Sequence, residues 1–264
     1  MISEDILETA HMLADAAGPI AREVWFGTGA TGYKPDGSAL TRADTEIEAR
    51  LREIVRARHP DHGILGEEEG AEGLDREAVW VIDPIDGTRQ FGARLMNFGV
   101  LVAFCEAGQP VLGLIDQPLA GARCLGVAGR GTKLNGRPVE SRREATLGDA
   151  VVALANPRSF GPEEREGYEA LAKAGRMHVF DGGCLAYAAL ARGMVDLCLN
   201  GGDLDAIDIC ALVPVVEGAG GAISDWRGAP LTLASSGAIL AAATPGLHAR
   251  ALDLITRTSP VWVP

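Results

Sequence analysis

The sequence predicts a mixed α/β protein, and three observations support that prediction. Apolar residues recur at helical spacing in two segments near the N-terminus, a series of short apolar runs follows them, and the second half alternates helix-like and strand-like segments. A chain of 264 residues, of which 47% are hydrophobic, can bury a large core. We therefore expect one large α/β unit or two closely packed halves.

The N-terminal part is expected to combine two helices with a multistranded sheet. The first helix is predicted at residues 6–25, and the second begins near Asp44, where acidic side chains favour a helix start. The stretch 27–40 between them is glycine-rich and polar. Apolar runs bounded by turn residues predict strands at 63–65, 79–82, 98–104, 111–115 and 123–127, with a hairpin turn at 106–109.

The second half is expected to alternate strands and helices. The predicted strands are 151–155, 195–199, 223–226 and 239–243, and the predicted helices are 162–174, 184–191, 208–219 and 247–256. A polar stretch at 135–147 separates the two parts. The predicted division is residues 1–140, which hold the acidic motifs, and residues 141–264, packed together as one functional unit.

Composition argues against several functions. The net charge of −12 disfavours a nucleic-acid partner, because affinity for a phosphate backbone depends on clustered Lys and Arg. An acidic enzyme acting on a phosphate ester needs a counter-charge, which divalent cations can supply. The sequence has neither a signal-peptide pattern nor an apolar stretch of membrane-spanning length, so we expect a cytoplasmic protein without a membrane partner. Five cysteines without a C-x-x-C pair favour reduced thiols.

The first candidate for chemistry is a pair of aspartates at a predicted strand end. Asp83 and Asp86 follow an apolar run with Pro84 between them, and Gly87-Thr88 allows a sharp turn into a short helix. Carboxylates beside the free backbone N–H groups of a helix start can hold a hard cation next to a phosphate. An Asx turn with a helix N-cap would explain one of the aspartates, but explains both less well.

Two further acidic positions accompany this pair. Gly66-Glu67-Glu68 follows another short apolar run, and alone it is typical of a solvated acidic loop. Asp208 precedes an apolar helical stripe, so its default role is a helix N-cap. A carboxylate at a helix start can also ligate a metal, so the three acidic positions together predict a metal site.

In order along the chain, these blocks resemble the signature of the inositol monophosphatase superfamily, which has G-E-E, D-P-[IL]-D-G-T and W-D-x-A-A motifs followed by an E-A-G-G-like helix end. Here they are 66–68, 83–88 and 207–211, leading to 217–221. The similarity extends through 34–44 and 113–118, so it covers most of the chain. The resemblance implies an inositol-monophosphatase-like αβαβα sandwich that hydrolyses a small phosphate monoester with a metal-activated water.

Within that superfamily, the chain looks most like the histidinol-phosphate phosphatase branch. The segments that carry this similarity are 34–38, 116–118, 129–136 and 211–221. The expected substrate is therefore L-histidinol phosphate, converted to L-histidinol and phosphate. Inositol 1-phosphate and a 3′-phosphoadenosine nucleotide are alternatives.

The resemblance also implies a set of metal ligands. One ion would be held by Glu67, Asp83 and the carbonyl of Ile85. A second would be held by Asp83, Asp86 and Asp208, and a looser third would lie near Glu67. Mg²⁺ is the expected cofactor, with two or three ions per site, because it prefers hard oxygen ligands.

The catalytic residues implied by the resemblance are Glu67, Thr88 and Asp44. Glu67 and the Thr88 hydroxyl would orient the attacking water, Asp44 would accept a hydrogen bond from Thr88, and no phosphoenzyme would form. The implied phosphate-binding residues are Asp86, Gly87, Thr88 and Asp208. The resemblance further implies a homodimer.

The chain departs from the family pattern where the alcohol part of the substrate is expected. Ile207 stands where a tryptophan usually precedes the metal-binding aspartate, and a glutamate common upstream of it falls on Asn200 or Gly201. A G-G-D-C segment of the histidinol-phosphate branch is replaced by D-G-G-C at 181–184. Acidic residues near these positions favour a cationic amine such as histidinol: Asp181, Asp203 and Asp205.

Two rival hypotheses remain open at this point. A haloacid-dehalogenase-type phosphatase also places aspartates before Gly-Thr and would form an aspartyl-phosphate on Asp83, but its D-x-D spacing needs an acid at Pro84. The second rival is a non-catalytic phosphate-binding or assembly protein on the same fold, suggested by the departures near Asn200 and Ile207.

Overall fold

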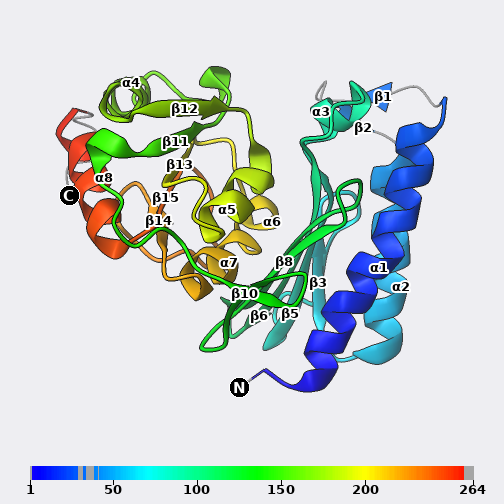
Figure 1. Cartoon of the computed structure of the whole chain (residues 1–264). Coiled ribbons are helices and arrows are strands. Elements are labelled where there is room, and N and C mark those ends of the chain that lie inside the picture. The colour runs from blue at the N-terminus through cyan, green and yellow to red at the C-terminus, as the bar shows by residue number, and fades with distance from the viewer. Residues whose placement is uncertain (1, 29–31, 34–38, 41, 259–264) are drawn as a thin grey trace.

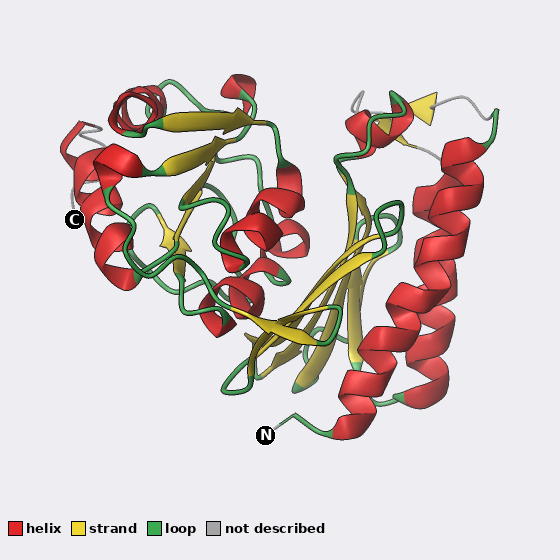
Figure 2. Ribbon diagram, viewed as in Figure 1, coloured by secondary structure: helices red, strands yellow, loops and turns green. Residues whose placement is uncertain are grey.

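The computed structural model describes residues 2–28, 32–33, 39–40 and 42–258, and these residues form five layers in the order α, β, α, β, α (Figures 1 and 2). The αβαβα sandwich expected from the sequence is thus confirmed. Segment 34–38 and Thr41, which contributed to the family resemblance, lie outside the described residues.

The first outer layer consists of α1 (Glu4–Phe26) and α2 (Arg42–Arg58), which confirms both predicted N-terminal helices. The hydroxyl of Ser3 caps α1 by accepting a hydrogen bond from the Ile6 N–H at 3.3 Å. A short ladder pairs β1 (Gly32–Tyr33) with β2 (Ala39–Leu40). Both helices cover one face of the first sheet (Figure 1).

In the described ranges the first sheet has eight strands in the order β10-β9-β8-β7-β6-β5-β3-β4. Its strands are β3 (Gly63–Gly66), β4 (Gly70–Glu72), β5 (Ala78–Asp86), β6 (Gly99–Glu106), β7 (Gln109–Gln117), β8 (Ala122–Val127), β9 (Gly131–Leu134) and β10 (Arg137–Val139). β3 and β5 are parallel, and the other ladders are antiparallel. The predicted hairpin turn joins β6 to β7, with Ala107 and Gly108 both at positive φ.

The central strand β5 shows how side chains alternate between the two cores. Trp80 and Ile82 pack beneath α1 and α2, while Val79 and Val81 face the central helices, and all four are buried. β5 continues past the predicted strand end, with an irregularity in its pairing to β6 between Asp83 and Asp86. The two aspartates therefore lie in the last part of a buried strand.

A second sheet, of five strands among the same described residues, has the order β12-β11-β13-β15-β14. The strands are β11 (Val151–Leu154), β12 (Met177–Phe180), β13 (Leu197–Asn200), β14 (Ala222–Asp225) and β15 (Ile239–Ala242). Between the sheets lie α5 (Gly183–Ala191), α6 (Ala206–Ile209) and α7 (Leu212–Gly218). α4 (Arg165–Ala174) and α8 (Pro245–Thr258) cover the outer face, and α3 (Thr88–Gly92), η1 (Leu147–Asp149) and η2 (Pro157–Ser159) are short connections.

Glycines allow the central helical layer to approach the first sheet closely. A Cβ atom on Gly113 of β7 would lie 2.0 Å from the Ala211 carbonyl oxygen, and one on Gly126 of β8 would lie 2.2 Å from the Pro214 carbonyl oxygen. Backbone packs on backbone at these points. The close approach of the α6–α7 segment, which carries Asp208, to the first sheet therefore depends on these two glycines.

The structure corrects two features of the predicted element pattern. The single helix expected at 208–219 is divided into α6 and α7, since the Pro214 ring would clash with the carbonyl of Cys210 in a continuous helix. Strands β4, β9, β10 and β12 were not predicted, because they are short and mostly half-buried or exposed. β10 lies inside the polar stretch 135–147 that was expected to separate the two parts.

All five cysteines lie among the described residues, where they are buried and free of disulfides, as expected for structural thiols. Of the helices in the described ranges, none is both long enough and apolar enough to span a membrane.

A stacked histidine pair supports the junction between α2 and β3. The rings of His59 and His62 lie 4.6 Å apart and nearly parallel, and the Trp80 indole N–H donates to Nδ1 of His62 at 3.2 Å. Burial lowers the pKa of both imidazoles, and the charge of His59 lowers that of His62 further. The folded protein therefore favours the neutral rings.

We predict that acid weakens the fold through this pair. Because the folded-state pKa values lie below the ordinary value of 6.5, the stabilisation is complete above pH 6.5 and is lost as pH falls through the folded-state values. Urea unfolding at pH 7.5 and pH 5 measures the loss. His62→Gln keeps an acceptor for Trp80 without titrating, so its free energy of unfolding should fall less between these pH values; an equal fall in wild type and variant would contradict the prediction.

Candidate active site

Among the described residues, three carboxylates from β5 and α6 meet beyond the end of the first sheet. Asp83 and Asp86 come from the end of β5 and Asp208 from α6, and one oxygen of each lies within 4.8 Å of the other two. Asp83 is only 3% exposed, and the others are half-buried. The structure thus brings together the residues that the sequence assigned to one cation.

Backbone N–H groups orient these side chains. Each carboxylate accepts one hydrogen bond from the main chain, at 2.8 to 3.0 Å. The pairs are Ile85 N–H to Asp83, Cys184 N–H to Asp86 and Asp205 N–H to Asp208. Since Cys184 belongs to α5 and Asp205 to the start of α6, the central helical layer holds the site against the first sheet.

Asp208 does not have the helix N-cap role that the sequence predicted for it. The N-cap of α6 is Asp205, whose Oδ1 accepts the Ile207 N–H at 2.7 Å. Asp208 is the third helical residue, and its Oδ2 accepts the Asp205 N–H, which completes a capping box. The capping box fixes the Asp208 side chain beside Asp83 and Asp86.

The electrostatics of this group favour a bound cation. Burial raises the pKa of Asp83 well above its ordinary value, and the charges of Asp86, Glu67, Asp208 and Asp44 raise it further. Burial also raises the pKa of Asp208 to about 8. Burial raises the pKa of Asp86 as well, although hydrogen bonds from Cys184 oppose the change. Carboxylates this close resist ionising together, and a bound cation would stabilise their charged forms. Their oxygens are hard donors, so these residues fit a divalent cation such as Mg²⁺.

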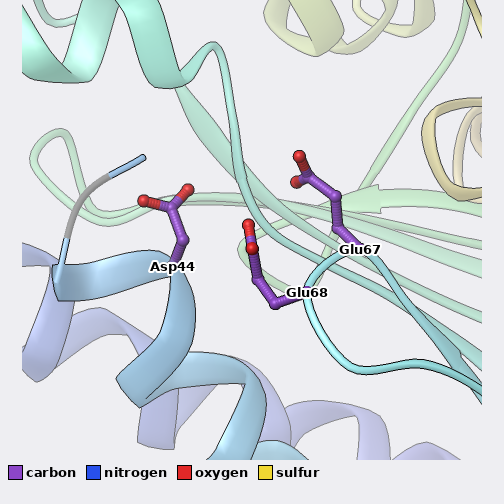
Figure 3. A group of neighbouring side chains, drawn as sticks. All are labelled: Asp44, Glu67 and Glu68. Carbon is purple, nitrogen blue, oxygen red and sulfur yellow. The ribbon is translucent and has the colours of Figure 1, made fainter. Parts of the chain in front are cut away.

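Asp44, Glu67 and Glu68 form a second carboxylate group (Figure 3). Asp44 comes from the first turn of α2, Glu67 and Glu68 come from the turn after β3, and one oxygen of each lies within 4.8 Å of the others. The sequence analysis did not assign Glu68, although the acidic run that contains it was the available signal. Glu67 is grouped with Asp44 here, yet it is near enough for its charge to raise the pKa of Asp83.

Thr88 connects the two groups. Gly87 has a φ of 86°, which permits the sharp turn into α3, and the Thr88 hydroxyl donates to the Ile85 carbonyl at 3.0 Å. The same hydroxyl lies 3.5 Å from Oδ1 of Asp44, so the contact expected between Thr88 and Asp44 is present but long. The Ile85 carbonyl, expected as a metal ligand, is an acceptor for Thr88 in this structure.

A pocket of about 240 Å³ opens beside these residues and is lined by both halves of the chain. Residues of the first half in its wall include Glu67, Asp86, Gly87, Thr88 and Arg89. The second half contributes Asn156, Asp181, Asn200, Asp203 and Leu204, among others. The pocket therefore joins the carboxylate groups to the region where the sequence departs from the family pattern.

Specific contacts fix that region in the pocket wall. The Tyr187 hydroxyl donates to Oδ1 of Asn200 at 2.7 Å, and a Cβ atom on Gly201 would lie 2.3 Å from the Ser159 carbonyl oxygen. Nε2 of Gln90 donates to Oδ2 of Asp181 at 2.8 Å. These contacts fix Asn200, Gly201 and Asp181 in the pocket wall.

Two functional candidates that the sequence analysis missed lie on α2. Glu48 and Arg52 are 0% and 1% exposed, and Glu48 accepts hydrogen bonds from the turn that carries Glu67. They follow Asp44 at intervals of four residues, on the helix face that also buries Ile47 and Leu51. Charged residues at apolar positions of a helix were the signal that could have identified them.

A larger groove, of about 950 Å³, lies between α1 and strands β7 to β9, away from the carboxylates. Several of its charged side chains pair with each other: Arg123 binds Asp116 at 2.7 Å and Asp15 at 2.8 Å, and Arg130 binds Glu4 at 2.9 Å. The smaller pocket offers the better chemistry, because the convergent carboxylates of Asp83, Asp86 and Asp208 lie at it or beside it.

Comparisons with known proteins agree with this geometry. The sequence matches the inositol monophosphatase family over residues 3–258. It is 38% identical over 252 residues to the bifunctional phosphatase IMPL2, chloroplastic, of Arabidopsis thaliana, covering 92% of this chain and 72% of that protein. It is 30% identical over 230 residues to a histidinol-phosphatase of Chlorobaculum parvum, covering 84% and 86%.

The fold comparison gives the same result. The solved structure of an inositol monophosphatase from Zymomonas mobilis superposes with a TM-score of 0.87 at 37% sequence identity, covering 96% of this chain and 98% of that one. An inositol monophosphatase from Anabaena superposes with a TM-score of 0.85 at 27% identity, covering 98% of both chains.

Proposed function

The chain belongs to the inositol monophosphatase family and is a phosphatase of phosphate monoesters, and from this premise we propose that it hydrolyses L-histidinol phosphate with Mg²⁺ as cofactor. This membership is incompatible with a haloacid-dehalogenase-type enzyme that forms an aspartyl-phosphate on Asp83. The proposed ligands are the carboxylates of Asp83, Asp86, Asp208 and Glu67, with the Ile85 carbonyl.

The observation that carries the substrate proposal is a pair of carboxylates that the second half of the chain adds to the pocket wall. Asp181 and Asp203 line the same pocket as Glu67 and Asp86. L-histidinol phosphate joins a phosphate to a primary ammonium group, so a pocket that offers both cation-binding carboxylates and the further carboxylates of Asp181 and Asp203 complements both groups. Burial raises the pKa of Asp203, the charge of Arg89 in the same pocket lowers it, and an ammonium group beside Asp203 would further favour its ionised form.

Relatives support the same substrate. Proteins named histidinol-phosphatase from Chlorobaculum parvum, Mycobacterium tuberculosis and Streptomyces coelicolor are 30%, 31% and 31% identical to this chain. Each is covered over more than four fifths of its length, at 86%, 90% and 88%.

In the proposed mechanism the side chains of this protein orient the reactants. Bound Mg²⁺ would supply charge neutralisation for the phosphate and activation of water. The Thr88 hydroxyl donates to Ile85, so its oxygen can accept a hydrogen bond from the attacking water. Glu67 would accept the proton of that water. Asp44, whose Oδ1 lies 3.5 Å from the Thr88 hydroxyl, would accept the single proton of that hydroxyl when the Ile85 carbonyl binds a cation instead. The backbone N–H groups of Gly87 and Thr88 would bind the phosphate.

Inositol 1-phosphate is the second candidate substrate. It is favoured by the likeness to the inositol monophosphatase from Zymomonas mobilis and by 31% identity to the inositol-1-monophosphatase ImpA of Mycolicibacterium smegmatis. The absence of the glutamate common in the family, whose place falls on Asn200 or Gly201, disfavours it, because that glutamate contacts the alcohol part of the substrate.

A phosphate-release assay with Mg²⁺ separates the candidates. We expect kcat/KM for L-histidinol phosphate to exceed that for inositol 1-phosphate and for a 3′-phosphoadenosine nucleotide by at least about tenfold, the usual effect of one charged hydrogen bond. Asp203→Asn should remove most of this preference while changing the rate on inositol 1-phosphate little. Equal or better hydrolysis of inositol 1-phosphate by the wild type would refute the substrate proposal.

A further inference from the structure

We infer that Glu48 and Arg52, two buried residues of α2, position the Glu67 carboxylate and thereby set the affinity of the site for divalent cations. The inference rests on the proposed role of Glu67 as a cation ligand. Glu48 and Arg52 bind backbone groups of the turn 66–70, so they would act on Glu67 through the turn that carries it.

The carboxylate of Glu48 holds the middle of this turn. Its Oε2 accepts the Glu68 N–H at 2.7 Å, and its Oε1 accepts the Glu69 N–H at 2.9 Å. Glu48 is fully buried, so water does not compete for these bonds. Hydrogen bonds from backbone N–H groups to an ionised carboxylate are short and strong. The two residues that follow Glu67 are thus fixed to a helix.

Arg52 completes the arrangement one helical turn further along α2. Its guanidinium contacts Oε1 of Glu48 through Nε at 2.9 Å and through Nη2 at 2.8 Å, and Nη2 also donates to the Gly70 carbonyl. The Arg52 side chain is only 2% exposed. Arg52 therefore neutralises the buried carboxylate and also binds the far end of the turn.

The near end of the turn is held by close packing. A Cβ atom on Gly66 would lie 2.2 Å from Oε1 of Glu48 and 2.8 Å from Nη2 of Arg52. Only glycine fits at this position while the buried ion pair stays in place. Glu67 is the residue between the packed Gly66 and the hydrogen-bonded Glu68, so its backbone has little freedom to move.

The same helix also carries Asp44, which lies beside Thr88, the other residue proposed to orient the attacking water. Asp44 precedes Glu48 by four residues, so the two side chains lie on one helix face about 6 Å apart along its axis. Asp44 lies 3.5 Å from the Thr88 hydroxyl. Figure 3 shows Asp44 on the first turn of α2 beside the turn that carries Glu67 and Glu68. One rigid helix thus sets the distance between Thr88 and Glu67.

The test compares Mg²⁺ binding by metal-free wild type and Glu48 variants, measured by calorimetry, with the Mg²⁺ dependence of phosphate release as a second readout. Glu48→Gln removes the charge. Glu48→Asp keeps the charge that Arg52 needs but cannot reach both N–H groups. We expect the half-saturating Mg²⁺ concentration to rise 10- to 100-fold in both variants, the usual effect of losing a group that orients a metal ligand. KM for the ester at saturating Mg²⁺ should change little, and high Mg²⁺ should restore part of kcat.

Two controls on α2 separate positioning from stability and from charge. Ile47→Val weakens the neighbouring core without touching the turn, and Glu53→Gln removes an exposed charge that pairs with Arg50. Both should bind Mg²⁺ as the wild type does. If Ile47→Val weakens Mg²⁺ binding as much as Glu48→Asp, the effect is one of stability and the inference is wrong.

A Glu67→Gln variant distinguishes failure of this inference from failure of the proposed role of Glu67 as a cation ligand. Weakened Mg²⁺ binding by Glu67→Gln together with normal binding by folded Glu48→Asp would overturn this inference alone. Normal Mg²⁺ binding by Glu67→Gln would overturn the proposed ligand role of Glu67 and this inference with it. Parallel losses in the Glu67 and Glu48 variants, with both controls unchanged, support the positioning role.

Discussion

Asp83→Asn is expected to abolish phosphate release and, at the same time, to stabilise the metal-free protein. Burial and the charges of four neighbouring carboxylates raise the pKa of Asp83, so ionising it in the folded protein is unfavourable until a cation binds. Asparagine keeps the size and the acceptor for the Ile85 N–H but carries no charge. Because bound metals supply several kcal/mol of transition-state stabilisation, we expect kcat/KM to fall by about 10³ or more.

Phosphate release and thermal unfolding, with EDTA or with Mg²⁺, measure both effects. The wild type should gain stability with Mg²⁺, by about 2.7 kcal/mol at a concentration of 100 times Kd, and Asp83→Asn should gain little. Asp75→Asn, at an exposed position, is the matched control and should behave as the wild type. An Asp83→Asn protein that is active, or that is less stable than the wild type in EDTA, would contradict this account.

Gly113→Ala is expected to have the largest effect on the fold. The added Cβ would lie 2.0 Å from the carbonyl oxygen and 2.8 Å from the carbonyl carbon of Ala211, and backbone atoms cannot rotate away. Overpacking of this kind lowers the free energy of unfolding by about 1–3 kcal/mol or more. Since Asp208 precedes Ala211 by three residues, moving this segment should also weaken Mg²⁺ binding.

Urea unfolding and Mg²⁺ titration measure the two consequences. Gly148→Ala adds the same methyl group in η1, where no heavy atom lies within 4 Å, so it controls for the loss of glycine itself. The two variants should differ clearly in stability. Equal stability would show that the contact between β7 and Ala211 does not limit the packing of the central layer.

The parts of the fold that the sequence could predict are those with strong apolar periodicity. α1, α2 and the buried core of β5 bury long apolar patterns, and the structure confirms them. β4 and β10 were not predicted because they have no apolar run. They are the two edge strands of the first sheet, and most of their residues are exposed. The division between α6 and α7 follows from Pro214. A single helix was predicted there, because the apolar stripe has helical spacing and the effect of the proline was not considered.

The candidate site divides in a similar way. Asp83, Asp86 and Asp208 could be grouped because motif order and strand-end placement both indicated them. The N-cap of α6 was assigned to Asp208, whereas the structure gives that role to Asp205, an aspartate that precedes the same apolar helix. Glu48 was missed because an acidic residue in a helix is usually solvated, and its burial follows only from the packing of α2 against the turn after β3.

The most direct test of the central claim is an anomalous difference map from crystals of the protein soaked with Mn²⁺, a close substitute for Mg²⁺ at oxygen-rich sites. We predict strong peaks within ligand distance of Asp83, Asp86 and Asp208, with one of the ions also reached by Glu67. Manganese bound only elsewhere, in an enzyme that Mn²⁺ activates, would contradict the account.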